Sequence, residues 1–222
     1  MDSIKIRVGS IDFSARTDDF YFPYSAQTVV EELTLKPWVY THGKFRQTAP
    51  RTGWQQVEFG KPIGSLWVVR TRHSEVATLP LSFRKKGVKH CDFKVSFDRK
   101  FVHEIMRRLS CGATMQQFSS LPAPRDTPDD YEISRVIVAG RISGASKRTR
   151  LTVDCHAKSK PGWHASAGDL DTACPASIVA QMLTEGLIAQ QGVLAPEVAV
   201  PVELFLAELK QRGMHCRVET SL

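Results

Sequence analysis

The densest group of chemically active side chains in the sequence is His73-Ser74-Glu75. It follows an apolar run that ends near Arg72, where a buried strand is expected to meet a short helical turn, and such junctions often carry functional residues. Histidine exchanges protons near neutral pH, and a glutamate beside it can orient the imidazole or bind an amine. A structural role fits equally well, because the helix dipole favours Glu75 at a helix N-terminus.

Two further helix starts carry polar groups. Tyr24-Ser25 precedes an expected helix, where the Ser25 hydroxyl is a favoured N-cap and the same position can bind a carboxylate. Thr172-Ala173-Cys174 begins another expected helix, and the cysteine there is either a small buried residue or an activated thiol. In both places the structural role is the simpler interpretation.

Neither a nucleotide-binding loop nor a metal site is evident in the residues. The segment Gly140-Arg141-Ile142-Ser143-Gly144 lacks the G-x-G-x-x-G spacing, and a hairpin turn is expected there. Cys155-His156 falls in an expected strand, which points the two side chains to opposite faces. The 5 cysteines are widely spaced and form no C-x-x-C pair. This pattern predicts free thiols in a reducing cytoplasm and no bound metal.

The spacing of apolar residues predicts the strands and helices that carry these side chains. Ile4, Ile6 and Val8 alternate with charged residues, as in a half-buried strand. Pro80 is expected to end the short helix after Ser74. The order predicts an α+β fold with a mainly antiparallel sheet and a helix-rich end. Further strands are expected over 38–45, 57–59, 65–72, 88–97, 134–141, 150–157 and 215–219, and helices over 26–35, 74–79, 101–109, 172–187 and 201–212.

Composition and charge limit the classes of protein to which this chain can belong. The chain has 222 residues, of which 42% are hydrophobic, so it can bury a large core without disulfides. No apolar run is long enough to span a membrane, and the first residues, MDSIKIRVGS, do not read as a signal peptide. The net charge is +7, and residues 84–108 hold nine Lys or Arg against three acidic residues. Such a patch can bind phosphates, but no recognisable nucleic-acid motif accompanies it.

Six stretches, taken together, resemble the C-terminal region of saccharopine dehydrogenase-like proteins. They occur in the family's order and extend over essentially the whole chain. They are 2–9 (DSIKIRVG), 22–25 (FPYS), 73–80 (HSEVATLP), 175–183 (PASIVAQML), 192–197 (GVLAPE) and 205–213 (FLAELKQRG).

The resemblance implies a fold and an organisation. Helices are expected on one face of the sheet, with residues 1–170 as a substrate-binding and dimerisation domain. Residues 171–222 are expected to be a helical segment that returns to a preceding Rossmann domain, which this sequence does not contain. NAD or NADP would bind that domain, so we expect no cofactor on this chain, no dehydrogenase activity from it alone, and a homodimer.

The resemblance also implies roles for residues of the cleft between the two domains. Glu75 is expected to bind a substrate ammonium, and His73 to transfer a proton or contact a carboxylate. Arg70 and Arg72 are expected to alternate on one strand, so that one of them clamps a carboxylate. The remaining expected substrate contacts are Tyr24, Ser25, Ser74 and Thr172.

The sequence departs from the fungal saccharopine reductases at one point. Those enzymes carry an arginine shortly after the Thr-Leu of this segment, whereas Pro80 follows Thr78-Leu79 here. The triplet His73-Ser74-Glu75 is more similar to the His-Glu-Glu stretch of carboxynorspermidine dehydrogenases. The expected substrate is therefore a secondary amine or imine of an amino acid or of a carboxylated polyamine. Two alternatives stay open: a non-enzymatic interaction or dimerisation module with the same fold, and a basic nucleic-acid-binding domain.

Overall fold

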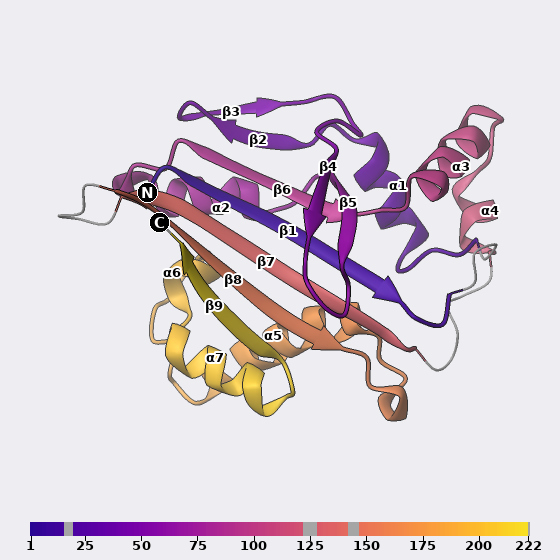
Figure 1. Ribbon diagram of the computed structural model, residues 1–222. Coiled ribbons are helices and arrows are strands. Elements are labelled where there is room, and N and C mark those ends of the chain that lie inside the picture. Colours follow the sequence, from indigo (N-terminus) through magenta and orange to yellow (C-terminus); the bar gives the residue numbers. More distant parts are fainter. Residues whose placement is uncertain (16–19, 122–127, 142–146, 222) are drawn as a thin grey trace.

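Strand β1 (Ser3–Asp12) lies in the middle of the sheet, and its side chains point alternately to the two faces. Its even-numbered residues Ile4 and Ile6 are buried beneath helices, whereas Arg7 points to the opposite face. β1 pairs in parallel with β6 (His90–Ser96) and antiparallel with β7 (Asp130–Arg141). The computed structural model describes residues 1–15, 20–121, 128–141 and 147–221 (Figure 1).

The described residues form one mixed, mainly antiparallel sheet of nine strands in the order β3-β2-β6-β1-β7-β8-β9, with β5 also paired to β6 and β4 paired to β5. The parallel β1–β6 pair is the exception among the described ladders. The remaining strands are β2 (Trp38–Thr41), β3 (Lys44–Gln47), β4 (Gln55–Glu58), β5 (Ser65–Arg70), β8 (Arg148–Lys158) and β9 (His215–Ser221).

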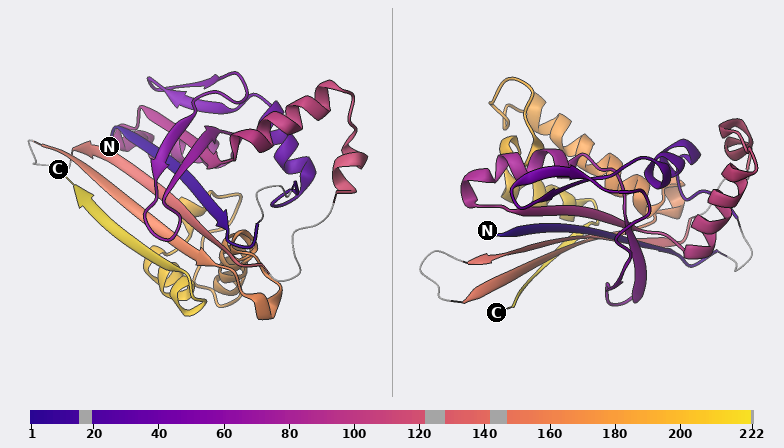
Figure 2. Two further views of the ribbon diagram at one scale, coloured as in Figure 1. Left: turned by 45° about the vertical axis from the view of Figure 1, so that its right-hand side comes forward. Right: turned by 90° about the horizontal axis from the view of Figure 1, so that it is seen from above.

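All α-helices of the described chain lie on one face of the sheet, which confirms the expected architecture (Figure 2). They are α1 (Ala26–Thr34), α2 (Glu75–Ser82), α3 (Arg99–Ser110), α4 (Met115–Ser119), α5 (Ala167–Thr184), α6 (Pro196–Ala199) and α7 (Val202–Gln211). Their side chains form separate apolar clusters. One joins α1, α3 and α4 to β5, and another joins α5 and α7 to β8.

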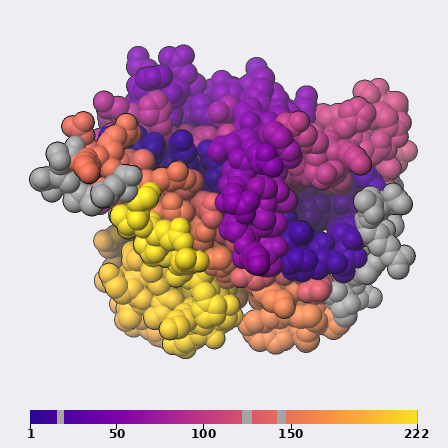
Figure 3. Space-filling model, in the orientation of Figure 1, coloured from indigo at the N-terminus to yellow at the C-terminus, as the bar shows by residue number. Residues whose placement is uncertain are grey.

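The opposite face of the sheet carries the β4–β5 hairpin, which lies across the strands (Figure 3). Phe59 of this hairpin packs directly on Gly9 of β1, where a Cβ atom would lie 2.6 Å from the phenyl ring. Glycine at this position is what allows the close approach. Val57, Ile63 and Ile133 complete a small buried cluster beneath the hairpin.

Helix α5 begins earlier than the sequence pattern predicts. Ser166, and not Thr172, is its N-cap: the Ser166 hydroxyl accepts a hydrogen bond from the Asp169 amide, and the Asp169 carboxylate accepts one from the Ser166 amide. Residue 170, the expected domain boundary, therefore lies inside this helix. After α7 the chain returns to the sheet as β9, which pairs with β8.

One smaller expectation also differs from the structure. Pro80 is buried and lies within α2, which continues for two residues beyond it, so the proline does not end the helix. The hairpin turn expected at 140–144 falls largely outside the described residues. None of the helices in the described part of the chain combines the length and apolarity needed to cross a bilayer.

Removing the Ser166 cap tests how much the start of α5 contributes to stability. We expect Ser166→Ala to lower the free energy of unfolding by about 1 kcal/mol, because the amide of Asp169 loses its acceptor. Urea unfolding followed by circular dichroism measures this. Ser177→Ala, at an exposed position in the same helix, is the matched control and should change little. Equal effects of the two substitutions would contradict the capping role.

Candidate functional site

A groove with a volume of about 2580 Å³ opens on the helix face of the sheet. Its floor is apolar and comes from the central strands, through Ile6 and Val8 of β1 and Val136 and Val138 of β7. Its walls include residues of α1 and α2 and of α5. Because the helices pack in separate groups, they leave this groove between them.

His73 forms the centre of a polar network in the wall of this groove. It follows β5 and leads into α2, and its ring stacks on Phe93 of β6 with 3.6 Å between ring centroids. Its Nε2 lies 2.9 Å from Oε1 of Glu32, and its Nδ1 lies 3.4 Å from Oε2 of Glu75. Tyr24 donates a hydrogen bond from its hydroxyl to the other Glu32 oxygen, 2.5 Å away.

These contacts keep the imidazole positively charged. Burial lowers the pKa of His73, but the hydrogen bonds and charges of Glu32 and Glu75 outweigh it and raise the pKa to about 9. Burial in turn raises the pKa of Glu75, yet contact with His73 brings it below its usual value. Near neutral pH the site therefore holds an imidazolium between two carboxylates.

A second polar group lies where β7 meets α5. Ser134 of β7 donates a hydrogen bond to Asp171 of α5 over 2.9 Å, and Glu132 and Asp171 interact directly. Burial and the neighbouring Asp171 carboxylate raise the pKa of Glu132 well above its usual range. Burial likewise raises the pKa of Asp130, which accepts a hydrogen bond from the Ala167 amide over 3.0 Å. A cation placed here would relieve the crowding of these carboxyl groups.

The groove is acidic overall. Among the described residues that line it, nine are Asp or Glu and two, Arg99 and Lys100, are Arg or Lys. Arg99 lies over the ring of Trp67, 3.9 Å from its centroid. The positive net charge of the chain is therefore not concentrated in this groove.

The structure brings together most, but not all, of the residues expected in the site. His73, Glu75, Tyr24, Ser25 and Thr172 line the groove. Ser25 also caps α1, accepting a hydrogen bond from the Thr28 amide over 3.4 Å. Thr172 lies within α5 and not at its N-cap.

Ser74, Arg70 and Arg72 do not line the groove. Ser74 is exposed at the start of α2 and makes no capping hydrogen bond with its side chain. Strand β5 ends at Arg70, whose side chain lies on the other face of the sheet near Asp92. Arg72 follows the strand and is exposed. The two arginines therefore do not alternate on one strand above the substrate.

Sequence reasoning missed Glu32 and Glu132. Glu32 is only 7% exposed and lies on the same helix as the buried residues Val29, Val30 and Leu33. A carboxylate within such an apolar stripe is a signal in itself, because a buried charge requires a partner. Its partner His73 is 41 residues away, so the sequence could not identify the pair. Glu132 shows no such signal, since it lies in an ordinary alternating strand.

The described residues show neither a metal centre nor a dinucleotide cradle. They contain no group of His, Cys, Asp and Glu side chains that could hold a metal ion. No described helix begins at a G-x-G loop after a strand, and Gly140 lies within β7, packed against the backbone of Met1. The phosphate-binding loop typical of Rossmann domains is therefore not found in the described part of this chain.

Comparison with known proteins identifies the fold. The sequence matches no protein-family model. The structure is similar to that of apo histidine-tagged saccharopine dehydrogenase (L-glutamate-forming) from Saccharomyces cerevisiae, with a TM-score of 0.70. The similarity covers 100% of this chain and 67% of the yeast chain, at 12% sequence identity. At that identity, what the two proteins are shown to share is the fold.

The network around His73 predicts a titration well outside the usual histidine range. We expect the His73 ring protons to titrate near pH 9 in NMR spectra, and Glu32→Gln to lower this pKa towards 6.5, the ordinary value. Because the pKa is raised on folding, these contacts stabilise the fold fully below pH 6.5. That contribution is lost as the pH rises through about 9.

The matched control is Glu31→Gln, an exposed position next to Glu32 on α1 that bonds to Gln27 instead. It should leave the pKa of His73 unchanged. A His73 pKa near 6.5 in the unmodified protein would contradict the network.

Proposed function

We propose that this chain is the substrate-binding and dimerisation part of an NAD(P)-dependent oxidoreductase that acts on a secondary amine or imine. The observation that carries the proposal is the acidic groove with His73 held between Glu32 and Glu75 in its wall. The shared fold with yeast saccharopine dehydrogenase supports the same class of reaction. The sequence resemblance to that family adds to it.

The charge of the groove favours an amine-rich substrate over one with several carboxylates. An ammonium group bound beside Glu132 and Asp171 would favour the charged form of Glu132, whose pKa is raised by burial and by Asp171. A substrate with three carboxylates would meet the same groups at a cost, with Arg99 and Lys100 the Arg and Lys side chains among the described lining residues. A carboxylated polyamine therefore fits better than saccharopine itself.

His73 would transfer a proton or contact a substrate carboxylate through Nδ1, whose 3.4 Å contact with Glu75 is the longer of its two contacts and would have to open. At neutral pH its imidazole is protonated, because Glu32 and Glu75 raise its pKa to about 9. Tyr24 holds the Glu32 carboxylate, and Phe93 holds the plane of the ring. An imidazolium fixed in this way has little freedom to reorient, which favours proton transfer to one defined atom.

The redox half of the reaction requires a coenzyme, and the described residues contain no G-x-G loop between a strand and a helix. A nicotinamide coenzyme, NAD or NADP, would supply or accept the hydride, and a separate Rossmann domain would have to hold it. We therefore expect no NADH binding and no dehydrogenase activity from this chain alone. Tight NADH binding to this chain, measured by calorimetry, would contradict the assignment of the coenzyme to a separate domain.

Calorimetry with two probes of opposite charge tests the substrate class. We expect spermidine to bind with saturation and citrate not to bind. Glu132→Gln and Asp171→Asn should each weaken spermidine binding by about tenfold, because one charge-assisted contact is worth about 1.5 kcal/mol or more. The exposed Glu185→Gln, outside the groove, is the control and should bind as the unmodified protein does.

The other outcomes separate the alternatives. Citrate binding without spermidine binding would contradict the proposed substrate class. Binding of neither probe would favour a non-enzymatic module with this fold.

The edge strand β9 is the surface we propose for the homodimer. It ends the strand order of the sheet, its residues are mostly exposed, and Val218 at its centre is 59% exposed. Arg217 and Glu219 flank Val218 and now pair with each other over 2.9 Å. Antiparallel pairing of two copies around Val218 would place Arg217 opposite the partner's Glu219, so the edge is complementary to itself.

Charge reversal on β9 tests this interface by sedimentation velocity. Glu219→Arg should abolish the dimer, because two arginines would face each other across the two-fold axis. Adding Arg217→Glu to the same chain should restore it, because the opposite charges again meet. A dimer that survives Glu219→Arg, or an unmodified protein that is monomeric, would contradict the proposal.

A further inference from the structure

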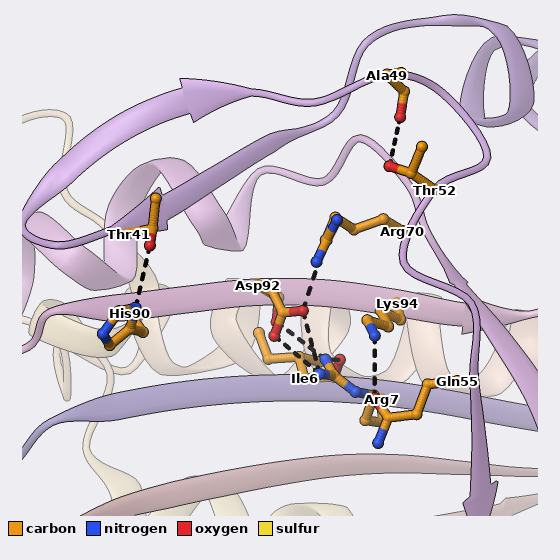
Figure 4. Close-up of polar contacts among 10 residues, drawn as sticks. All are labelled: Ile6, Arg7, Thr41, Ala49, Thr52, Gln55, Arg70, His90, Asp92 and Lys94. Carbon is orange, nitrogen blue, oxygen red and sulfur yellow. Dashed lines mark hydrogen bonds and ion pairs between the residues drawn. The ribbon is translucent and has the colours of Figure 1, made fainter.

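A cluster of basic side chains is buried on the sheet face opposite the groove. Arg7 of β1, Arg70 of β5 and Lys94 of β6 surround one acidic residue, Asp92 (Figure 4). We call these four residues the cationic cluster. Arg7 is 3% exposed and Lys94 is 6% exposed, so both are withdrawn from water.

Asp92 is the single carboxylate of the cationic cluster, and its hydrogen bonds come mainly from Arg7. Arg7 donates hydrogen bonds from Nη2 to both Asp92 oxygens, over 2.9 and 3.2 Å. Arg70 Nε lies 3.8 Å from Asp92 Oδ2, too far for a hydrogen bond. The Nε atoms of Arg7 and Arg70 are both buried, and neither has a hydrogen-bond partner among the described residues. Three cations therefore share one anion.

Lys94 has only a neutral partner in the described structure. Its Nζ donates to Oε1 of Gln55 over 3.0 Å. Burial and the nearby charge of Arg7 lower the pKa of Lys94 to about 8, and Asp92 does not offset them. A buried ammonium facing an amide, with two arginines close by, lacks the anion that would stabilise it.

Solvent can reach the cationic cluster past partly exposed side chains. Gln55 belongs to the β4–β5 hairpin and is exposed, so its side chain can turn away. The Arg70 side chain is 25% exposed, and Lys5 is exposed one position before Ile6 on β1. The loop before β4 passes close to Arg70 because residue 53 is a glycine. A Cβ atom at Gly53 would lie 2.7 Å from the guanidinium carbon of Arg70.

We propose that the cationic cluster is a binding site for a small oxyanion, a phosphate or carboxylate group, held mainly by Lys94 and Arg70. The anion replaces Gln55 as the acceptor of the Lys94 ammonium, and the Arg70 guanidinium supplies further donors. A bond between an ammonium and an oxyanion, in which both partners are charged, is stronger than the ammonium–amide contact that it replaces. Asp92 keeps Arg7 in place beneath the anion and contributes no donor.

This site is separate from the groove, because it lies on the other face of the sheet. Its occupant does not need to be the substrate, and its function does not depend on the proposed oxidoreductase activity. The cluster also accounts for part of the positive charge of the chain, which the acidic groove does not use.

Thermal stability and calorimetry at constant ionic strength test the site. Inorganic phosphate should raise the melting temperature with saturation, whereas chloride at the same ionic strength should not. Lys94→Gln and Arg70→Gln should each weaken phosphate binding by about tenfold or more. Lys94→Arg, which keeps the charge, should retain most of the affinity.

The controls separate a built site from general attraction. Lys44→Gln removes an exposed charge from β3 and should bind phosphate as the unmodified protein does. Arg70 is partly exposed, so Arg70→Gln should fold even where Lys94→Gln does not, and far-ultraviolet circular dichroism checks this. Succinate in place of phosphate identifies the chemistry: tighter binding of one assigns the site to carboxylates or to phosphates.

Two results would overturn the proposal. One is the absence of saturable stabilisation by either phosphate or succinate relative to chloride. The other is equal binding by the unmodified protein, Lys94→Gln and Arg70→Gln, which would place the anion elsewhere on the surface.

Discussion

The alternation of side chains along the central strands is the constraint on which the rest of the molecule depends. In β1, Ile6 faces the helices and Arg7 faces the opposite side, and in β6 the same holds for Phe93 and Lys94. Two neighbouring strands thus supply an apolar floor to one site and buried cations to another. A shift of register by one residue would exchange the two faces, so the fold and both sites are specified together.

The groove owes its chemistry to elements that are distant in the chain. Glu32 comes from α1, Glu75 from α2 and Asp171 from α5, and three separate apolar clusters fix where each carboxylate lies. Charged groups are costly to bury, and here they are stabilised by pairing around His73 and crowded where Glu132 meets Asp171. The pairing around His73 keeps the imidazole protonated. The carboxyl groups of Glu132 and Asp171 would be stabilised by a bound cation.

The sequence allowed prediction of the features that arise from local patterns. Alternation located most of the strands, and the family resemblance correctly implied helices on one face of the sheet. The face on which Arg70 lies could not be predicted, because Val68 and Val69 are both fully buried and the apolar run shows no alternation. The start of α5 was misplaced because the Ser166 capping box precedes the apolar stripe. Glu32 was missed because its partner His73 comes from a different element.

We propose above all that the acidic groove, which holds Glu132 and Asp171 and has the His73 network in its wall, binds an amine. NMR mapping of spermidine binding on isotope-labelled protein tests this claim most directly. We expect saturable shifts at His73, Glu32 and Asp171, with residues of the β4–β5 hairpin on the opposite face unchanged. Shifts confined to that hairpin face, or no saturable shifts within the groove, would contradict it.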